Sequence, residues 1–83
     1  MSQYDADPSN EQRSEWAQTA LDAFARTTDM DTAGEDDGTI LGDLLTDLMH
    51  WCDYNNVDFE AKLANSIGMY EEELAEEEAS AMQ

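Results

Sequence analysis

The sequence predicts a small all-α domain built from three helices. Apolar residues recur three and four positions apart in three separate segments, which is the spacing of one face of a helix. No segment alternates apolar and polar residues as a half-buried strand does. A chain of 83 residues is long enough for one small core. We therefore expect a single helical domain over residues 9–76, between a disordered leader at 1–8 and a flexible acidic tail at 77–83.

The first helix is predicted over about residues 9–28. Ser9 is a favourable N-cap, and Gln12 stands three positions later, which is the capping-box pattern. The segment 29–38 that follows is rich in acidic and turn-forming residues and has no periodicity, so we expect an acidic loop there. The apolar face of this helix consists of Trp16, Ala17, Ala20, Leu21, Phe24 and Ala25.

The second and third helices are predicted over about residues 39–54 and 58–76. We expect Thr39 and Asp58 to cap their starts, and Asn55-Asn56 to end the second helix, because Asn tolerates the left-handed conformation. The short connection predicts an antiparallel hairpin with the first helix packed across it. The two apolar faces, which we expect to form the core, consist of Ile40, Leu41, Leu44, Leu45, Leu48, Met49 and Cys52, and of Phe59, Leu63, Ile67, Tyr70 and Leu74.

The third helix ends in an acidic cluster at residues 71–78. Its six glutamates stand at the negative end of the helix dipole, where carboxylates are unfavourable, and those four positions apart repel one another. We therefore expect the free helix to fray beyond about Leu74. A cationic partner would order it.

The net charge is the strongest indication of function. Asp and Glu number 21 against three Lys and Arg, which gives a formal charge of −18. Such self-repulsion does not stabilise a small domain, so we expect a partner with a basic surface to use it. Three cations are too few for the usual phosphate contacts, and an anionic lipid surface would repel the chain, so neither nucleic acid nor membrane is an expected partner.

The compartment is predicted from three absences in the sequence. Cys52 has no second cysteine to pair with, which is typical of a reducing compartment. The first residues lack the basic and apolar regions of a secretory signal, and no apolar run approaches the length of a membrane span. A cytoplasmic protein is therefore expected.

Rows of carboxylates are the candidate partner-binding feature. Carboxylates four residues apart on a helix lie ~6 Å apart along its axis. The phosphates of one nucleic-acid strand follow one another with an axial rise of ~3.4 Å. We therefore expect a helical scaffold with such rows to occupy a groove built for phosphates. The candidate residues are Glu11, Glu15, Asp22, Asp29, Asp31, Glu35, Asp36, Asp37, Asp43, Asp47, Glu71, Glu72, Glu73, Glu76 and Glu77.

Residues with catalytic or metal-binding chemistry are too few for a site. His50 and Cys52 point apart on a helix, so they do not form a nucleophilic pair. Asp29 and Asp31 match the first positions of an EF-hand loop, but Ile40 stands where that loop needs a bidentate Glu. No catalytic residue, metal site or cofactor is expected.

The stretch from Gly42 to Tyr70 resembles the second half of the MazG-like all-α nucleoside triphosphate pyrophosphohydrolases. Asp47 matches the Asp of the Glu-x-x-Asp metal motif of that family, and Val57-Asp58 matches the start of its next helix. Leu44 stands at the Glu position, and the upstream Glu-Glu-x-x-Glu motif is not where the family has it. The resemblance implies a helical hairpin without the metal ligands for catalysis.

In size and charge the chain resembles the small acidic anti-restriction and anti-CRISPR proteins of phages and mobile elements. This resemblance implies a non-enzymatic inhibitor that mimics nucleic acid, acts in the host cytoplasm and blocks the basic nucleic-acid-binding groove of a defence complex. The alternatives are a degenerate MazG-like regulatory or dimerisation module, and an acidic chaperone or assembly factor that masks a basic protein. Adaptation to a very salty solvent would explain the acidity without a partner. The partner's identity and the oligomeric state stay open.

Overall fold

The computed structural model describes residues 8–81, and all the regular secondary structure in that range is helical. The all-α prediction is confirmed for this part of the chain, whereas the expected set of three helices leaves out the short α2. The leader, apart from Pro8, and the last two residues of the tail lie outside the described residues. The helices are α1 (Asn10–Thr27), α2 (Met30–Ala33), α3 (Asp37–Tyr54) and α4 (Phe59–Ala81).

Side-chain caps fix the starts of the three long helices. The Ser9 hydroxyl accepts the backbone N–H of Gln12 at 3.1 Å, and the Asp58 carboxylate accepts the backbone N–H of Ala61 at 3.0 Å, so both predicted caps are confirmed. The prediction for α3 was wrong. Asp36 rather than Thr39 is its cap, because the Asp36 carboxylate accepts the backbone N–H of Thr39 at 2.7 Å.

The acidic segment between α1 and α3 contains one turn of helix where a loop was expected. Asp29 and Gly34 bracket this turn, α2, and both have a left-handed backbone with φ of 61° and 75°. The left-handed Asp29 reverses the chain just after α1 ends at Thr27. The spacing of four and seven residues from Glu11 through Glu15 and Asp22 to Asp29 predicts one row on one helix. That prediction is wrong for Asp29, which lies beyond the end of α1.

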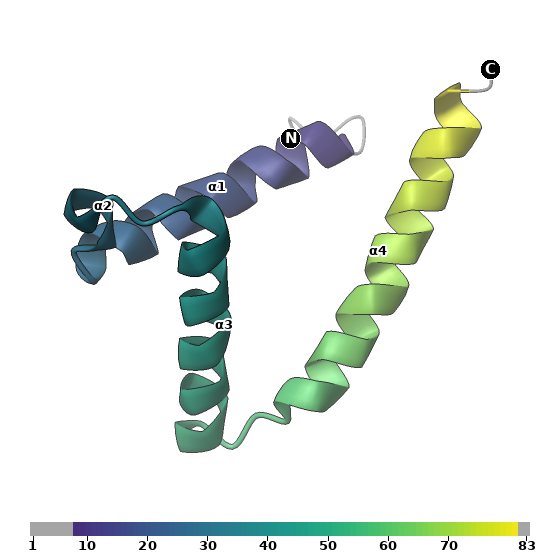
Figure 1. The fold of residues 1–83 in the computed structure, drawn as a ribbon. Coiled ribbons are helices and arrows are strands. Elements are labelled where there is room, and N and C mark those ends of the chain that lie inside the picture. Colours follow the sequence, from purple (N-terminus) through teal and green to yellow (C-terminus); the bar gives the residue numbers. More distant parts are fainter. Residues whose placement is uncertain (1–7, 82–83) are drawn as a thin grey trace, which may run out of the picture.

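The three long helices are arranged as an open triangular frame (Figure 1). α3 and α4 meet at the turn over residues 55–58, where Asn56 adopts the expected left-handed conformation, and then diverge. α1 packs against α2 and α3 near its C-terminal end and reaches α4 at its N-terminal end. The predicted hairpin is therefore wrong: α1 joins the far ends of α3 and α4 instead of packing across a closed pair.

The boundaries of the long helices differ slightly from those predicted. α4 continues to Ala81, beyond the expected end at 76, even though its last turns are rich in glutamate. Glu73 and Glu77 on these turns contact the first turn of α1, and this tertiary contact supports α4 where its own sequence disfavours a helix.

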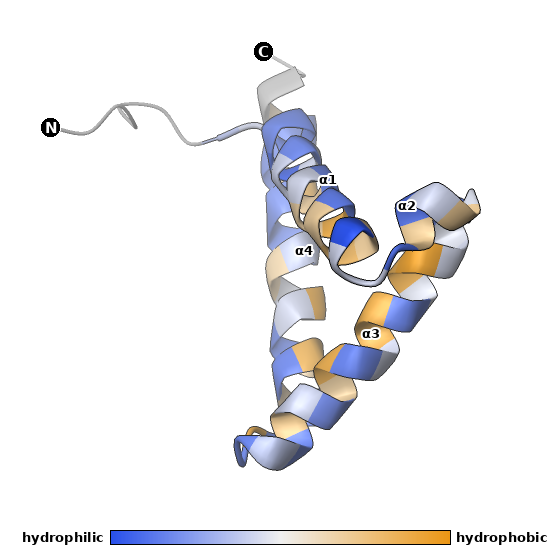
Figure 2. Ribbon diagram, turned by 90° about the vertical axis from the view of Figure 1, so that its left-hand side faces the viewer, coloured by the Kyte–Doolittle hydropathy of each residue, from blue (hydrophilic) through white to orange (hydrophobic). Residues whose placement is uncertain are grey.

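The buried side chains are few. Among the described residues only Ala25, Ile40 and Cys52 are buried, which confirms Cys52 as a core residue. The frame is extended, with a radius of gyration of 15.8 Å, against about 12 Å for a compact chain of this length. Figure 2 shows that hydrophobic residues are concentrated in α3 and hydrophilic ones toward the C-terminal end of α4.

Most of the predicted core is therefore exposed. On α3, the side chains of Leu41 and Leu45 are 46% and 41% exposed, and on α4 that of Ile67 is 50% exposed. Tyr54, the last residue of α3, is 88% exposed. The physical reason is the divergence of α3 and α4, which leaves their facing apolar sides without a partner helix.

Candidate protein-binding surface

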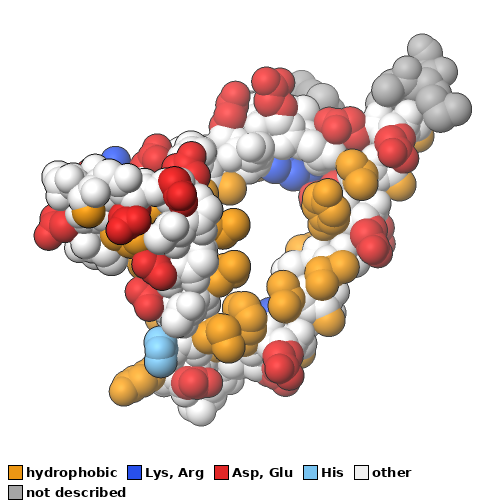
Figure 3. Space-filling view, in the orientation of Figure 1, with side chains coloured by type: hydrophobic (Ala, Val, Ile, Leu, Met, Phe, Trp, Pro, Cys, Tyr) orange, Lys and Arg blue, Asp and Glu red, His pale blue; other side chains and the backbone are white. Residues whose placement is uncertain are grey.

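The predicted partner-binding carboxylates lie on all four helices and on the segments that join them. Every one of these side chains is exposed except that of Glu73, which is half-buried. Figure 3 shows acidic side chains along the outer edge of the frame, whereas hydrophobic side chains gather around its central opening. The structure therefore separates the charge from the apolar faces.

Four of these carboxylates also make hydrogen bonds within the fold. Asp22 accepts the side-chain amide of Gln18 at 3.0 Å, and Asp31 accepts the backbone N–H of Thr32 at 2.8 Å. Asp36 caps α3, and the hydrogen bonds from the backbone and side chain of Thr39 lower the pKa of its carboxyl below the ordinary value of 3.8. Glu77 accepts the backbone N–H of Asn10 at 3.3 Å.

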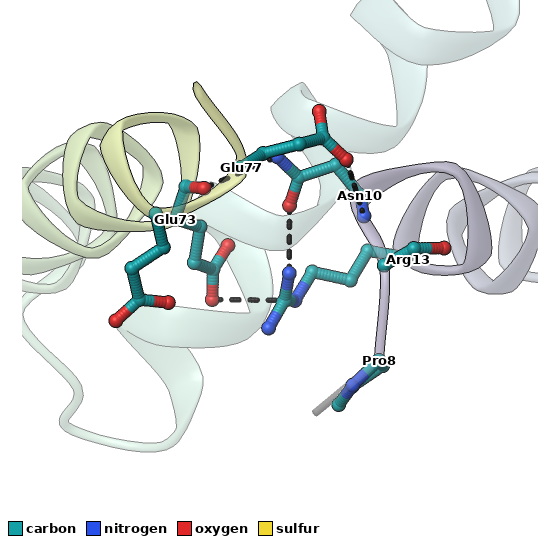
Figure 4. Close-up of a pocket in the computed structure, with 7 residues that line it drawn as sticks. Pro8, Asn10, Arg13, Glu73 and Glu77 are labelled. Carbon is teal, nitrogen blue, oxygen red and sulfur yellow. Dashed lines mark hydrogen bonds and ion pairs between the residues drawn. The ribbon is translucent and has the colours of Figure 1, made fainter. Parts of the chain in front are cut away.

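The N-terminal turn of α1 and the glutamates of α4 form a polar corner (Figure 4). The Arg13 guanidinium donates to the Asn10 side-chain oxygen at 2.6 Å and lies 3.4 Å from a Glu73 carboxylate oxygen. The Asn10 side-chain amide donates to the backbone carbonyl of Glu73 at 3.3 Å. The corner encloses an open pocket of about 270 Å³, and its lining residues are Pro8, Ser9, Asn10, Arg13, Glu73, Glu76 and Glu77.

This corner assigns Glu73 and Glu77 a structural role in addition to the predicted binding role. The Arg13–Glu73 contact is the one ion pair within residues 8–81. The two other cations, Arg26 and Lys62, neutralise no carboxylate at salt-bridge distance there. Nearly all of the negative charge is therefore left facing solvent.

The sequence interpretation missed the second feature of the site, an inner apolar surface. We use this name for Leu41, Leu45 and Leu48 on α3, and Leu63, Ile67 and Leu74 on α4, each of which is between 39% and 50% exposed. Their spacing of three, four and seven residues places each set on one face of its helix. In the sequence alone, that spacing predicts a buried core. It indicates a face that needs covering but not what covers it.

Within the described range, the side chains that could bind a metal ion or act in catalysis do not form a cluster. No group of three or more His, Cys, Asp or Glu side chains lies close enough to hold a metal ion there. His50 is exposed and Cys52 is buried. Asp47, which matches the MazG-like metal motif, is an exposed carboxylate on α3.

Two further observations complete the description. Across residues 8–81, none of the helices combines the length and hydrophobicity that a membrane crossing requires. Comparison with known protein families, curated proteins and solved structures found no match to this chain.

Proposed function

We propose that this chain is a non-enzymatic acidic inhibitor that occupies the basic nucleic-acid-binding groove of a partner protein, in the cytoplasm of a host cell. One observation carries the proposal. Outside the Arg13–Glu73 pair, the carboxylates of the described residues are exposed and lie in no ion pair. An ordinary solvated surface intersperses both signs of charge, and this one does not.

The geometry of α1 supports a mimic of a phosphate backbone. Glu11, Glu15 and Asp22 are exposed on this helix at spacings of four and seven residues. These spacings correspond to axial separations of ~6 and ~10 Å, close to two and three phosphate steps of one strand. Rigid helices keep such charges in place, so an arginine-rich groove meets a preformed row of carboxylates.

The field of the whole chain supports the same function. A net charge of −18 attracts a basic surface over a Debye length and raises the association rate. Because the attraction is between charges, binding weakens as salt is added. A partner whose groove is filled in this way is unable to bind its nucleic acid.

Competition with DNA tests the proposal. The purified chain is immobilised and incubated at low salt with a nuclease-treated lysate of the source cells, and the retained protein is then purified. We expect it to bind DNA or RNA, and we expect a duplex oligonucleotide and the acidic chain to displace each other from it. Binding should weaken at least tenfold between about 50 and 200 mM salt.

Matched variants separate a row of carboxylates from mere net charge. The test variant carries Glu11→Gln, Glu15→Gln and Asp22→Asn. The control carries Asp53→Asn, Asp58→Asn and Glu60→Gln, which removes the same number of charges outside the candidate set. We expect weaker binding from the first variant and little change from the second.

Three results would contradict the proposal. Equal losses of binding in both triple variants would show that binding depends on net charge and not on the row of carboxylates on α1. A retained protein that oligonucleotides do not displace would favour the assembly-factor alternative. Hydrolysis of a nucleoside triphosphate by the purified chain with Mg²⁺ would contradict its non-enzymatic character.

A further inference from the structure

The inner apolar surface is the largest feature of the molecule that the proposed function leaves unused. It lies on the facing sides of α3 and α4, where Figure 3 shows hydrophobic side chains around the central opening. Tyr70, which falls on the same stripe of α4, adds aromatic area, with 62% of its surface exposed. Soluble single chains rarely expose apolar side chains in such a continuous set.

The total exposed area shows how much surface is without a partner. The chain exposes 6754 Å², against about 5,000 Å² for a compact monomer of its mass, an excess of about 1,800 Å². A generous allowance for the nine residues outside the described range still leaves an excess of about 700 Å². Each partner in a stable dimer buries about 800 Å² or more, so the excess is of the size that one dimer interface covers.

The core of the single chain indicates the same need. The apolar area that three side chains bury stabilises the fold too little to offset the conformational entropy lost when more than seventy residues become ordered. These side chains are Ala25, Ile40 and Cys52. Chains of this kind acquire the rest of their core by association. The partner must therefore be present whenever the chain folds, a condition that a second copy meets.

The charges at one end of the inner apolar surface are consistent with a second copy. Over the first three turns of α4 the charged residues are Glu60 and Lys62, one of each sign, so this part of the surface has no net preference for a cationic helix. The carboxylates lie on the outer edge of the frame, where two copies joined through their inner faces keep them apart.

We propose that a second copy of this chain covers the inner apolar surface, so that the protein is a homodimer joined through α3 and α4. A two-fold arrangement uses the same surface on both copies, and each copy contributes the apolar faces that the other lacks. The carboxylates on the outer edge then remain free for a basic partner.

The mass of the full chain in solution tests this inference. In sedimentation equilibrium we expect twice the mass of one chain, and a dimer that becomes tighter as salt is added, because salt screens the repulsion between two chains of charge −18. This salt dependence is opposite to that of binding to a basic partner. Thermal unfolding supplies a second measurement that needs no variant: the unfolding midpoint should rise with protein concentration, because a dimer unfolds to two separate chains.

A pair of substitutions on α4 tests the assigned face. Ile67→Glu places a charge in the inner apolar surface, and we expect it to raise the dissociation constant of the dimer by about a hundredfold or more, because both copies lose a buried side chain. Met69→Glu is the control. It adds the same charge two residues away, outside the apolar stripe, and should leave the dimer intact.

The inference is overturned by a helical monomer whose unfolding midpoint does not depend on protein concentration. It is also overturned if Ile67→Glu leaves the dimer unchanged, or if the chain orders only on addition of a basic amphipathic peptide. Dimerisation and DNA competition are separate measurements, so a dimer that captures no nucleic-acid-binding protein would contradict the proposed function alone.

Discussion

Asp36, at the start of α3, is an exposed carboxylate whose ionised form is stabilised by hydrogen bonds. Its hydrogen bonds with Thr39 lower the pKa of the folded state below 3.8. A lowered folded pKa means that the ionised carboxylate stabilises the fold at every pH above the unfolded value. This stabilisation is lost as the pH falls through the folded pKa.

The substitution Asp36→Asn isolates this effect. Asn caps a helix nearly as well as Asp but carries no charge. We expect the difference in unfolding free energy between the native chain and the variant to be constant from pH 7 to about 5 and to shrink below about pH 4. Urea titrations at a series of pH values measure it. A difference that persists unchanged at pH 2 would show that the charge of Asp36 contributes nothing.

Caps were the part of the structure that the sequence predicted best. Ser9 and Asp58 each stand just before an apolar face, and the interaction that makes them caps spans only three residues. At α3, both Asp36 and Thr39 precede the apolar face. The sequence-based prediction chose Thr39, whereas the extended backbone at Asp36 and its hydrogen bond with the N–H of Thr39 make Asp36 the cap.

Among the helices, α4 carries glutamates near its C-terminal end, where they interact unfavourably with the helix dipole. The substitution Glu76→Lys should stabilise the protein by about 0.5 kcal/mol, because it places a cation near the C-terminal end and pairs it with Glu72 four positions earlier. The substitution Glu60→Lys at the other end of α4 is the matched reversal and should destabilise it by a similar amount. Urea unfolding at low salt measures both, and shifts of the same sign would contradict the prediction.

The attachment of α4 to α1 depends on the polar corner. The substitution Arg13→Met removes the Glu73 ion pair and the hydrogen bond to Asn10 while keeping an apolar stem. We expect amide exchange in residues 71–79 to rise up to about fivefold, the equivalent of up to about 1 kcal/mol, with α3 unaffected. The substitution Arg26→Met is the control, since Arg26 makes no ion pair within the described residues. Equal effects of the two substitutions would assign the change to net charge.

Elements were predicted less completely than caps, for two reasons. α2 is a single turn, too short to show an apolar period, and its limits are set by the left-handed backbone at Asp29 and Gly34. The angle between α3 and α4 depends on the turn at residues 55–58 and on the distant corner at Arg13 and Glu73. Helical periodicity identifies the apolar face of each helix but contains no information about that angle.

For the whole molecule, the sequence predicted a surplus of acidic charge but not the surplus of apolar surface. The acidic surplus follows from counting residues. The apolar surplus emerges only when the faces of α3 and α4 are placed in space and found to diverge. Together they describe a chain with two unsatisfied surfaces, a carboxylate edge on the outside and an apolar face on the inside.

The effect of salt on stability distinguishes two explanations of the carboxylate edge, binding to a basic partner and adaptation to a salty solvent. If the acidic residues bind a partner, their mutual repulsion destabilises the free protein. NaCl screens this repulsion, so adding it should raise the unfolding free energy. The rise should level off by about 0.5 to 1 M, where the Debye length falls to a few ångströms. Urea is the denaturant for this measurement because guanidinium is itself a salt. The variant Glu11→Gln, Glu15→Gln, Asp22→Asn should show a smaller rise than the native chain. Stability that keeps rising to several molar salt, with an unfolded chain below 1 M, would identify adaptation to a salty solvent and remove the main support for a basic partner.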